Sequence, residues 1–265
     1  MKIEQMKILC AGDSITKGRL GSSYVQLLQK AYPHWCIVNK GADGLPLCTI
    51  GHRLLTTLQS DASFDVIVLQ TGYNDMLLPS FAARNVFFQN ALRWCIRKGH
   101  VPIESAQLFG KALEALIKNV QAICKAKIIL TTIACLGENL SSDLNMQRRQ
   151  YNEAIRKAAV HYGCAVADTS ILFYEHISTQ SMPDYLLPSF LNTVFFDPFI
   201  SYLPGGVHTL SRYRGLKLTI DGCHLNKWGA ALFKSEVERM LLEISTHRPE
   251  AHQEMSVFVS EQYQK

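Results

Sequence analysis

Residues 6–14 read Met6-Lys7-Ile8-Leu9-Cys10-Ala11-Gly12-Asp13-Ser14, and they predict the class of fold. The apolar run Ile8–Ala11 is typical of a short buried β-strand, which Gly12 ends. Ser14 therefore follows the carboxyl end of a strand. Open α/β sheets bind their ligands at this end of their strands, so the segment indicates an α/β fold with a polar site beginning at Ser14.

The rest of the chain repeats this pattern of apolar runs separated by amphipathic segments. Further strands are predicted at Cys36–Asn39, Val66–Gln70, Ile128–Thr132 and Ala165–Asp168. Helices are predicted over Ser22–Tyr32, Ile50–Ser60, Ser105–Lys125, Leu144–Tyr162 and Lys227–Ile244. This β-α-β-α order indicates a parallel sheet with helices on both faces. Right-handed crossovers then bring the carboxyl ends of the strands to one edge.

The composition predicts one domain with a sizeable core. The 265 residues are 48% hydrophobic and 18% charged, which is too apolar for general disorder. No linker rich in Gly, Pro or Ser divides the chain, so residues 1–265 are expected to form a single domain. Two insertions, Met76–Pro102 and Tyr174–Leu218, interrupt the alternation of strands and helices. The second is apolar and long for a connection, and such segments usually carry function.

Charge and cysteine content restrict the partners and the location. The net charge is +5, but the basic residues are scattered and form no stripe with stacking aromatics, so no nucleic-acid partner is expected. The eight cysteines form no Cys-x-x-Cys pair and fit reduced thiols in a reducing compartment. We find no signal peptide and no run that could span a bilayer. A cytoplasmic location is therefore expected, with export without a cleaved signal as the alternative.

A second polar segment, Asp221-Gly222-Cys223-His224, lies near the C-terminus. A serine hydroxyl is a poor nucleophile at neutral pH and needs a base within hydrogen-bonding reach, which His224 can supply. Asp221 lies three residues earlier, so one loop can present both the base and the carboxylate that orients it. The segment and Ser14 thus offer the three parts of a serine-hydrolase centre. The alternative role for Ser14 is to cap the helix that follows it. Cys223 lies between the acid and the base, and its two interpretations are a redox role and a small residue that only fills space.

Attack on an ester creates an oxyanion, which needs donors that are already in position. Gly41 follows the strand predicted at Cys36–Asn39, and a glycine lets a backbone N–H approach a ligand closely. Asn74 follows the next strand and carries a neutral amide donor. With the backbone N–H of Ser14, these groups are the candidate oxyanion donors. Both Gly41 and Asn74 have a turn role as the alternative. The histidines lack metal-ligand spacing, and neither a metal nor a cofactor is expected.

Together these four segments resemble the SGNH hydrolase family, also called GDSL lipases and esterases. The Gly-Asp-Ser block matches Gly12–Ile15, with Ile in place of Leu, and the glycine of the second block matches Gly41. The Gly-x-Asn-Asp block matches Gly72–Asp75, and the Asp-x-x-His block matches Asp221–His224. The order and rough spacing agree from residue 6 to about residue 245.

The resemblance implies a three-layer α/β/α fold with a five-stranded parallel sheet in the flavodoxin-like order 2-1-3-4-5. It implies Ser14 as nucleophile, His224 as base and Asp221 as the orienting acid. It also implies an oxyanion hole made of the Ser14 N–H, the Gly41 N–H and the Asn74 side chain. The Gly-x-Ser-x-Gly elbow of α/β-hydrolases is absent, since Thr16 stands at the position of its second glycine.

The expected activity is hydrolysis of a carboxylic ester through an acyl-Ser14 intermediate. The apolar insertions favour a lipid-type or short-to-medium acyl ester. A carbohydrate O-acetyl esterase and an acyltransferase are the alternatives, and a non-catalytic binding protein on the same fold is the alternative of another class. The aromatic stretch Phe190–Tyr202 can pack on the core or wall an acyl pocket, with membrane contact as a third interpretation. The sequence indicates no oligomeric state.

Overall fold

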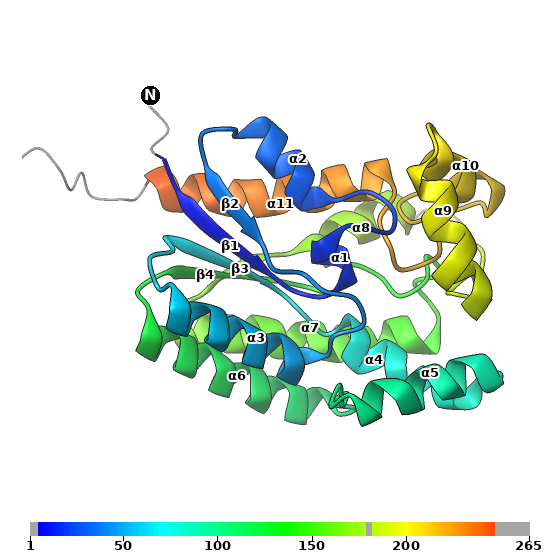
Figure 1. The fold of residues 1–265 in the computed structure, drawn as a ribbon, viewed down its shortest axis with the longest axis horizontal. Coiled ribbons are helices and arrows are strands. Elements are labelled where there is room, and N and C mark those ends of the chain that lie inside the picture. Colours follow the sequence, from blue (N-terminus) through cyan, green and yellow to red (C-terminus); the bar gives the residue numbers. More distant parts are fainter. Residues whose placement is uncertain (1–4, 179–181, 247–265) are drawn as a thin grey trace, which may run out of the picture.

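A computed structural model describes residues 5–178 and 182–246. Its centre is a five-stranded sheet, in which all neighbouring strands are parallel (Figure 1). The strands are β1 (Lys7–Ala11), β2 (Cys36–Asn39), β3 (Val66–Gln70), β4 (Lys127–Thr131) and β5 (Ala165–Ala167). Their spatial order is β2-β1-β3-β4-β5, which confirms the predicted order 2-1-3-4-5. Strand β3 lies in the middle and is buried along its whole length.

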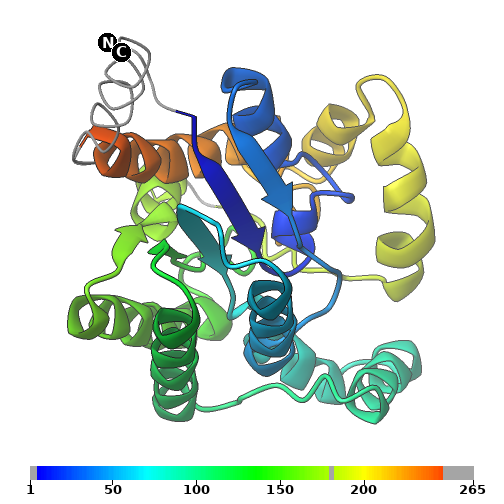
Figure 2. The same ribbon diagram turned by 60° about the vertical axis from the view of Figure 1, so that its left-hand side comes forward.

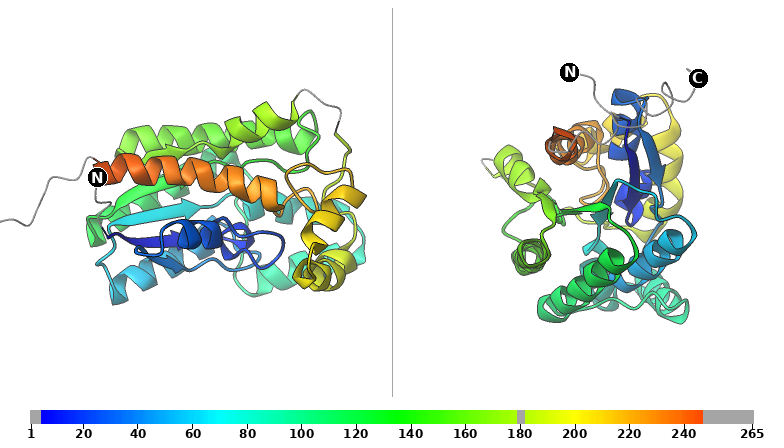
Figure 3. Two further views of the ribbon diagram at one scale, coloured as in Figure 1. Left: turned by 90° about the horizontal axis from the view of Figure 1, so that it is seen from above. Right: turned by 90° about the vertical axis from the view of Figure 1, so that its left-hand side faces the viewer.

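Helices cover both faces of the sheet, and this confirms the three-layer α/β/α arrangement (Figure 3). One layer contains α2 (Tyr24–Ala31), α8 (Thr169–Ile177) and α11 (Lys227–Thr246). The other contains α3 (Leu47–Ser60), α6 (Ala106–Ile123) and α7 (Asp143–Tyr162). Local chemistry sets the ends of these helices: the Ser142 hydroxyl caps the start of α7, and Gly163 ends it in the left-handed conformation, with φ 63°. No helix among the described residues is both long and apolar enough to cross a bilayer.

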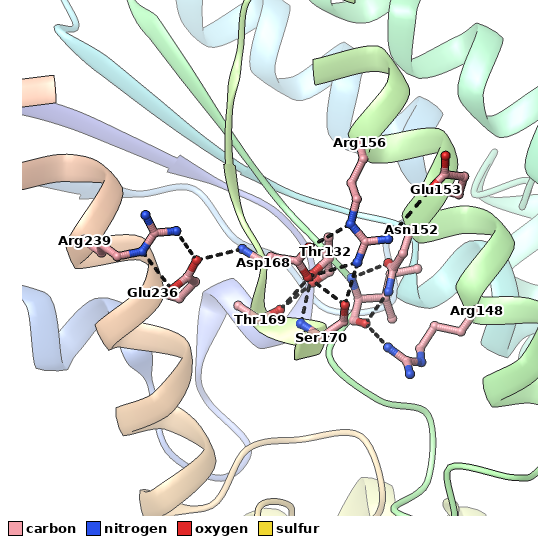
Figure 4. A network of polar contacts seen from close by, with 11 residues as sticks. Thr132, Arg148, Asn152, Glu153, Arg156, Asp168, Thr169, Ser170, Glu236 and Arg239 are labelled. Carbon is pink, nitrogen blue, oxygen red and sulfur yellow. Dashed lines mark hydrogen bonds and ion pairs between the residues drawn. The ribbon is translucent and has the colours of Figure 1, made fainter. Parts of the chain in front are cut away.

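A polar network fastens the carboxyl ends of β4 and β5 to the helices around them (Figure 4). Asp168 follows β5 directly, and its carboxylate accepts hydrogen bonds from Arg156 Nε on α7 at 2.7 Å and from the Thr132 hydroxyl at 3.0 Å. The Asp168 backbone N–H in turn donates to Glu236 on α11. Strand β4 ends at Thr131 and β5 at Ala167, each one residue earlier than predicted, and the next residues, Thr132 and Asp168, belong to this network.

The two insertions form short helices at the carboxyl edge of the sheet (Figure 2). The first contains α4 (Tyr73–Ser80), the 3-10 turn η1 (Phe81–Ala83) and α5 (Val86–Arg97). The second contains the π-helical segment η2 (Asn192–Phe196), α9 (Asp197–Tyr202) and α10 (Gly206–Tyr213). Helix α8, which the sequence did not predict, runs through Tyr174 to Ile177, so the second departure from the regular pattern begins after Ile177.

Candidate active site

Ser14 is the first residue of the short helix α1 (Ser14–Lys17), immediately beyond the carboxyl end of β1. The Asp13 carboxylate caps this helix by accepting the Ile15 N–H at 2.9 Å. Gly12 is needed for the tight exit from the strand, because a Cβ there would lie 2.3 Å from Thr16 Oγ1 and 2.9 Å from the Gln70 carbonyl oxygen. The backbone therefore fixes Ser14 at the edge of the sheet, as the sequence predicted.

The structure brings Asp221, His224 and Ser14 together. His224 Nε2 lies 3.0 Å from Ser14 Oγ, and His224 Nδ1 lies 2.7 Å from Asp221 Oδ2. The other carboxylate oxygen, Asp221 Oδ1, accepts the backbone N–H of His224 at 2.7 Å and that of Cys223 at 3.0 Å. The loop thus holds its own carboxylate rigid, and that carboxylate orients the imidazole towards the serine hydroxyl.

Electrostatics favour a basic imidazole next to an ionised carboxylate. Burial by itself would raise the pKa of Asp221, but the His224 charge and the hydrogen bonds from the loop outweigh it and hold this pKa below its ordinary value. Burial would lower the pKa of His224, but the Asp221 carboxylate, with smaller contributions from Asp13 and Asp43, raises it above its ordinary value of 6.5. The arrangement therefore stabilises an imidazolium when His224 accepts a proton.

Glu138 supports this loop, although it stands in none of the motifs of the sequence. Its carboxylate is almost fully buried and accepts the backbone N–H groups of Lys217, Leu218 and Thr219 at 2.7–2.8 Å. It also accepts the Thr219 hydroxyl at 2.7 Å. Its partners lie 79 to 81 positions away along the chain and are mainly backbone groups, which leave no pattern of side chains in the sequence. Glu138 thus anchors the turn that leads into Asp221.

The start of α11 holds the loop from its other side. Asn226 Oδ1 accepts the backbone N–H groups of Trp228 and Gly229 at 2.9 and 3.0 Å and so caps the helix. Its Nδ2 donates to the Lys217 carbonyl at 2.7 Å. The acid–base loop is therefore bound to a helix end and to a buried carboxylate, so it has little freedom to move.

Asn74 lies near Ser14 at the start of α4, but its side-chain amide already has partners. Asn74 Nδ2 donates to the Leu45 carbonyl and to Asp13 Oδ2, at 3.2 Å in both cases. The neighbouring Asp75 carboxylate accepts the backbone N–H groups of Leu47 at 2.9 Å and Ile103 at 3.0 Å, so it ties two loops to α4. Burial raises the pKa values of Asp13 and Asp75 to about 6.

The loop after β2 contains two glycines in different settings. The Gly41 N–H donates to Asn39 Oδ1 at 2.9 Å, and a Cβ on Gly41 would lie 2.2 Å from the backbone nitrogen of Lys17. Gly44 has a φ of +70°, and a Cβ there would meet nothing within 4 Å. Within the described part of the chain, the N–H groups of Gly44 and Ser14 have no hydrogen-bond acceptor. Gly41 is thus packed and occupied, whereas the Gly44 N–H is open.

The cysteine thiols take no part in this geometry. All eight are free, and Cys36 and Cys48 are the exposed ones. Cys223 is buried between the acid and the base, and burial raises the pKa of its thiol well above the ordinary value, so it is an unreactive filler. Within residues 5–178 and 182–246, no group of three or more His, Cys, Asp or Glu side chains is arranged to hold a metal ion.

A sequence model of the GDSL-like lipase/acylhydrolase family matches residues 10–232, which is most of the chain. The chain belongs to this family. The matched region begins within β1, at Cys10, and includes the Ser14 turn, Asn74 and the Asp221–His224 loop. Membership of the GDSL-like family makes the protein a serine hydrolase that acts on ester bonds, as the sequence predicted. None of the curated proteins matches the chain in sequence.

Solved structures of other esterases share the fold of this GDSL-like hydrolase. The acetyl xylan esterase AlAXEase is 21% identical, with a TM-score of 0.61 over 89% of this chain and 100% of its own. A catalytic mutant of Axe2, an acetylxylan esterase from Geobacillus stearothermophilus, is 19% identical, with a TM-score of 0.59 over 90% of this chain and 95% of its own. A lipolytic protein of the G-D-S-L family from Veillonella parvula is 17% identical, with a TM-score of 0.58 over 89% and 98%. At these identities the likeness establishes the fold.

Proposed function

We propose that Ser14 is the nucleophile of this esterase, His224 its general base and Asp221 the residue that orients and stabilises the imidazole. One observation carries the proposal: an unbroken chain of contacts from Ser14 Oγ to His224 Nε2 at 3.0 Å and from His224 Nδ1 to Asp221 Oδ2 at 2.7 Å. These are the distances at which a base can take the hydroxyl proton during attack. With Nδ1–H donating to the carboxylate, Nε2 is the free acceptor that faces the serine.

The chemistry follows in two halves. Ser14 Oγ forms a bond to the ester carbonyl carbon while His224 Nε2 takes the hydroxyl proton, and the carbonyl oxygen becomes an oxyanion. The intermediate collapses, the bond to the alcohol oxygen breaks, and His224 gives its proton to that oxygen. Water then attacks the acyl-Ser14 carbonyl carbon while His224 takes a proton from it; the bond to Ser14 Oγ breaks, His224 gives the proton back to that oxygen, and the acid leaves.

The oxyanion hole is proposed to consist of the Ser14 N–H, the Asn74 amide and a glycine N–H from the loop after β2. Gly41 is the glycine implied by the family resemblance, but its N–H already donates to Asn39. Gly44 is the better candidate because its N–H is open and the next residue, Leu45, is a partner of Asn74. Asn74 must release one of its two acceptors to receive the oxyanion.

We propose a lipid-type ester with a short-to-medium acyl chain as the substrate. The support is the exposed aromatic character of the second insertion, whose residues Phe195, Phe196 and Phe199 are all more than half exposed. An O-acetylated carbohydrate is the second candidate, supported by the fold shared with AlAXEase and Axe2. The remaining alternative is an acyltransferase, in which an acceptor other than water takes the acyl group from either kind of ester.

Two measurements test the function. A fluorophosphonate probe should label the wild-type protein and fail to label Ser14→Ala, which should also lose several orders of magnitude in ester turnover. Rapid hydrolysis by Ser14→Ala would contradict the assignment of the nucleophile. A chain-length series of p-nitrophenyl esters, run beside acetylated xylooligosaccharides, then separates the substrates. Preference for acetyl groups alone would favour the carbohydrate ester over the lipid-type ester.

A further inference from the structure

The exposed apolar side chains of this protein are concentrated in the two insertions. The described residues include 20 large hydrophobic side chains that are exposed, and 14 of them lie within residues 76–102 and 174–218. These segments make up little more than a quarter of the chain, so scatter over the surface does not account for the distribution. An exposed apolar patch of this kind marks an interaction surface.

The two insertions meet at the edge of the sheet that carries the active site (Figures 1 and 2). The rings of Phe88 and Phe190 make an edge contact with centroids 5.5 Å apart. Arg84 Nη1 donates to the carbonyl oxygens of Leu186 and Leu187 at 3.2 and 2.8 Å. The Leu187 N–H donates to the Asp221 carbonyl at 2.9 Å, so the second insertion is bonded directly to the catalytic loop.

Helix α5 supplies a face that combines aromatic rings with cations. Phe87, Trp94, Arg93 and Arg97 line one groove of about 480 Å³ together with Phe190 from the second insertion. The side chain of Trp94 is 58% exposed. Residues 76–102 contain four Lys or Arg residues and no Asp or Glu. The face is therefore positive, and nothing in its own segment neutralises it.

The tip of the second insertion is apolar and presents no charge. Phe199 is 67% exposed and Tyr202 72% exposed, and both lie on α9. The single Asp, Glu, Lys, Arg or His within residues 191–205 is Asp197. It is buried in an ion pair with Arg214, whose two terminal nitrogens lie 2.9 and 2.6 Å from its oxygens. Contact with hydrocarbon at this tip therefore removes no exposed charge from water.

We propose that these two faces form a single docking surface for a lipid bilayer that carries anionic headgroups. We call it the rim surface and define it by Phe87, Arg93, Trp94, Arg97, Phe199 and Tyr202. The α9 aromatics enter the boundary between headgroups and acyl chains, and the α5 arginines pair with lipid phosphates. A second copy of the chain fits less well, since an isologous contact would bring the positive α5 faces of both copies together.

This inference deepens the proposed function and rests on it for the identity of the site that the surface serves. Docking at the rim would place the edge that carries Ser14 next to the bilayer, where lipid-type esters are concentrated. Binding itself does not require turnover. The Ser14→Ala protein is therefore expected to bind vesicles as the wild type does, and vesicle binding can be judged whether or not Ser14 is the nucleophile.

The experiment is co-sedimentation of the full-length Ser14→Ala protein with phosphatidylcholine vesicles, with and without phosphatidylglycerol. Binding should need the anionic lipid and weaken as ionic strength rises. Replacing two arginines, Arg93→Gln with Arg97→Gln, should weaken binding roughly 30-fold, because each basic residue near an anionic surface contributes about 5-fold. Replacing two aromatics, Phe199→Ser with Tyr202→Ser, should weaken binding by roughly tenfold or more, because two rings no longer bury apolar surface in the bilayer boundary.

Matched controls come from other surfaces of the protein. Lys111→Gln with Lys118→Gln removes two cations from α6, and Val160→Ser with Ile171→Ser removes two exposed apolar side chains from α7 and α8. These controls should bind like the parent protein, and thermal unfolding should confirm that every variant is folded.

A spectroscopic measurement locates the contact. In a Trp228→Phe background, brominated lipid should quench Trp94, since the other tryptophan, Trp35, is buried. Three results would overturn the proposal. The first is that the protein does not sediment with phosphatidylglycerol vesicles at low salt, and the second is that either rim variant binds vesicles as tightly as the parent protein does. The third is that the protein forms a dimer in solution which the pair Phe199→Ser and Tyr202→Ser dissociates. If vesicle binding persists while Ser14 proves inert to the fluorophosphonate, the docking surface stands and the proposed function fails.

Discussion

Replacing Glu138 by Gln should damage both stability and catalysis, although Glu138 touches no reacting atom. Gln has the same shape, and its amide oxygen can replace Oε1, which accepts from Leu218 N, Thr219 N and Thr219 Oγ1. Its NH2 group then faces the Lys217 N–H, which now donates to Oε2 at 2.7 Å. One donor is left buried against another donor.

The magnitude follows from these four bonds. An unsatisfied buried N–H costs about 1–3 kcal/mol, and each remaining bond weakens by roughly 1 kcal/mol when its acceptor loses its charge. Relief from burying a carboxylate offsets part of this sum. We therefore expect the free energy of unfolding to fall by about 3 kcal/mol.

Turnover should fall because the anchored turn leads directly into the catalytic loop. Thr219 lies two residues before Asp221, and the Ile220 N–H donates to the His224 carbonyl at 2.8 Å. A shift of the turn is thus transmitted to the imidazole, and a displacement of about 1 Å costs on the order of 100-fold in rate. The loss should appear in kcat rather than in KM, since the geometry of proton transfer changes more than the binding of substrate.

The assay combines urea unfolding with ester kinetics at a temperature where the variant is fully folded. Glu175→Gln, an exposed change on α8, is the matched control and should leave both quantities unchanged. If Glu138→Gln unfolds more easily but keeps wild-type kcat and fluorophosphonate labelling per folded molecule, Glu138 only stabilises the fold. Its positioning of the catalytic loop would then be refuted.

Three further predictions concern the base and the oxyanion donors. His224 must be neutral to act as a base, and its pKa is raised, so kcat/KM should fall with decreasing pH at a midpoint above 6.5. Because the Asp43 charge contributes to this rise, Asp43→Asn should lower the midpoint, most clearly at low salt. Gly41→Ala should lower the free energy of unfolding in urea severely, because the new Cβ would clash with the backbone, whereas Gly44→Ala should lower it by about 1–2 kcal/mol because of the positive φ. Equal losses for the two variants would contradict this packing. Asn74→Ala should reduce kcat by roughly 100-fold with little change in KM, which steady-state kinetics would test.

The sheet could be predicted from the sequence because its strands are short apolar runs with clear ends. The predicted bounds of Cys36–Asn39 and Val66–Gln70 match those observed, since each run is followed by a change to polar or glycine residues. Helix α8 was missed because it starts directly after β5, where Asp168 and Thr169 join the polar network instead of forming a loop. The periodicity of apolar residues does not reveal a helix that follows a strand without an intervening loop.

The proximity of Ser14, Asp221 and His224 could be anticipated for a different reason. These residues stand in short motifs, and the family resemblance supplied the long-range pairing of the two segments. Glu138 has no such motif, because carboxylate-to-backbone bonds impose a pattern on neither partner. The sequence likewise does not distinguish the two loop glycines. The Gly41 N–H is occupied only because the Asn39 side chain points towards it, and no sequence pattern predicts that orientation.

The hydrogen bonds of Asn74 give the proposed oxyanion hole a way to favour the transition state over the bound ester. Both acceptors of its amide lie at 3.2 Å, which is long for a bond to the Asp13 carboxylate. A neutral ester carbonyl is a weak acceptor, so the bound ester gains little from replacing Asp13 or the Leu45 carbonyl as the partner of the Asn74 amide. A full oxyanion is a much stronger acceptor, and the exchange becomes favourable only as charge develops on the substrate. Because the interaction strengthens during the reaction, it lowers the barrier instead of tightening substrate binding. Asp13 can lie this close to the hole because it is fully buried: burial raises its pKa to about 6, which brings its neutral form closer in free energy than that of an exposed carboxyl and lessens the repulsion between two negative charges.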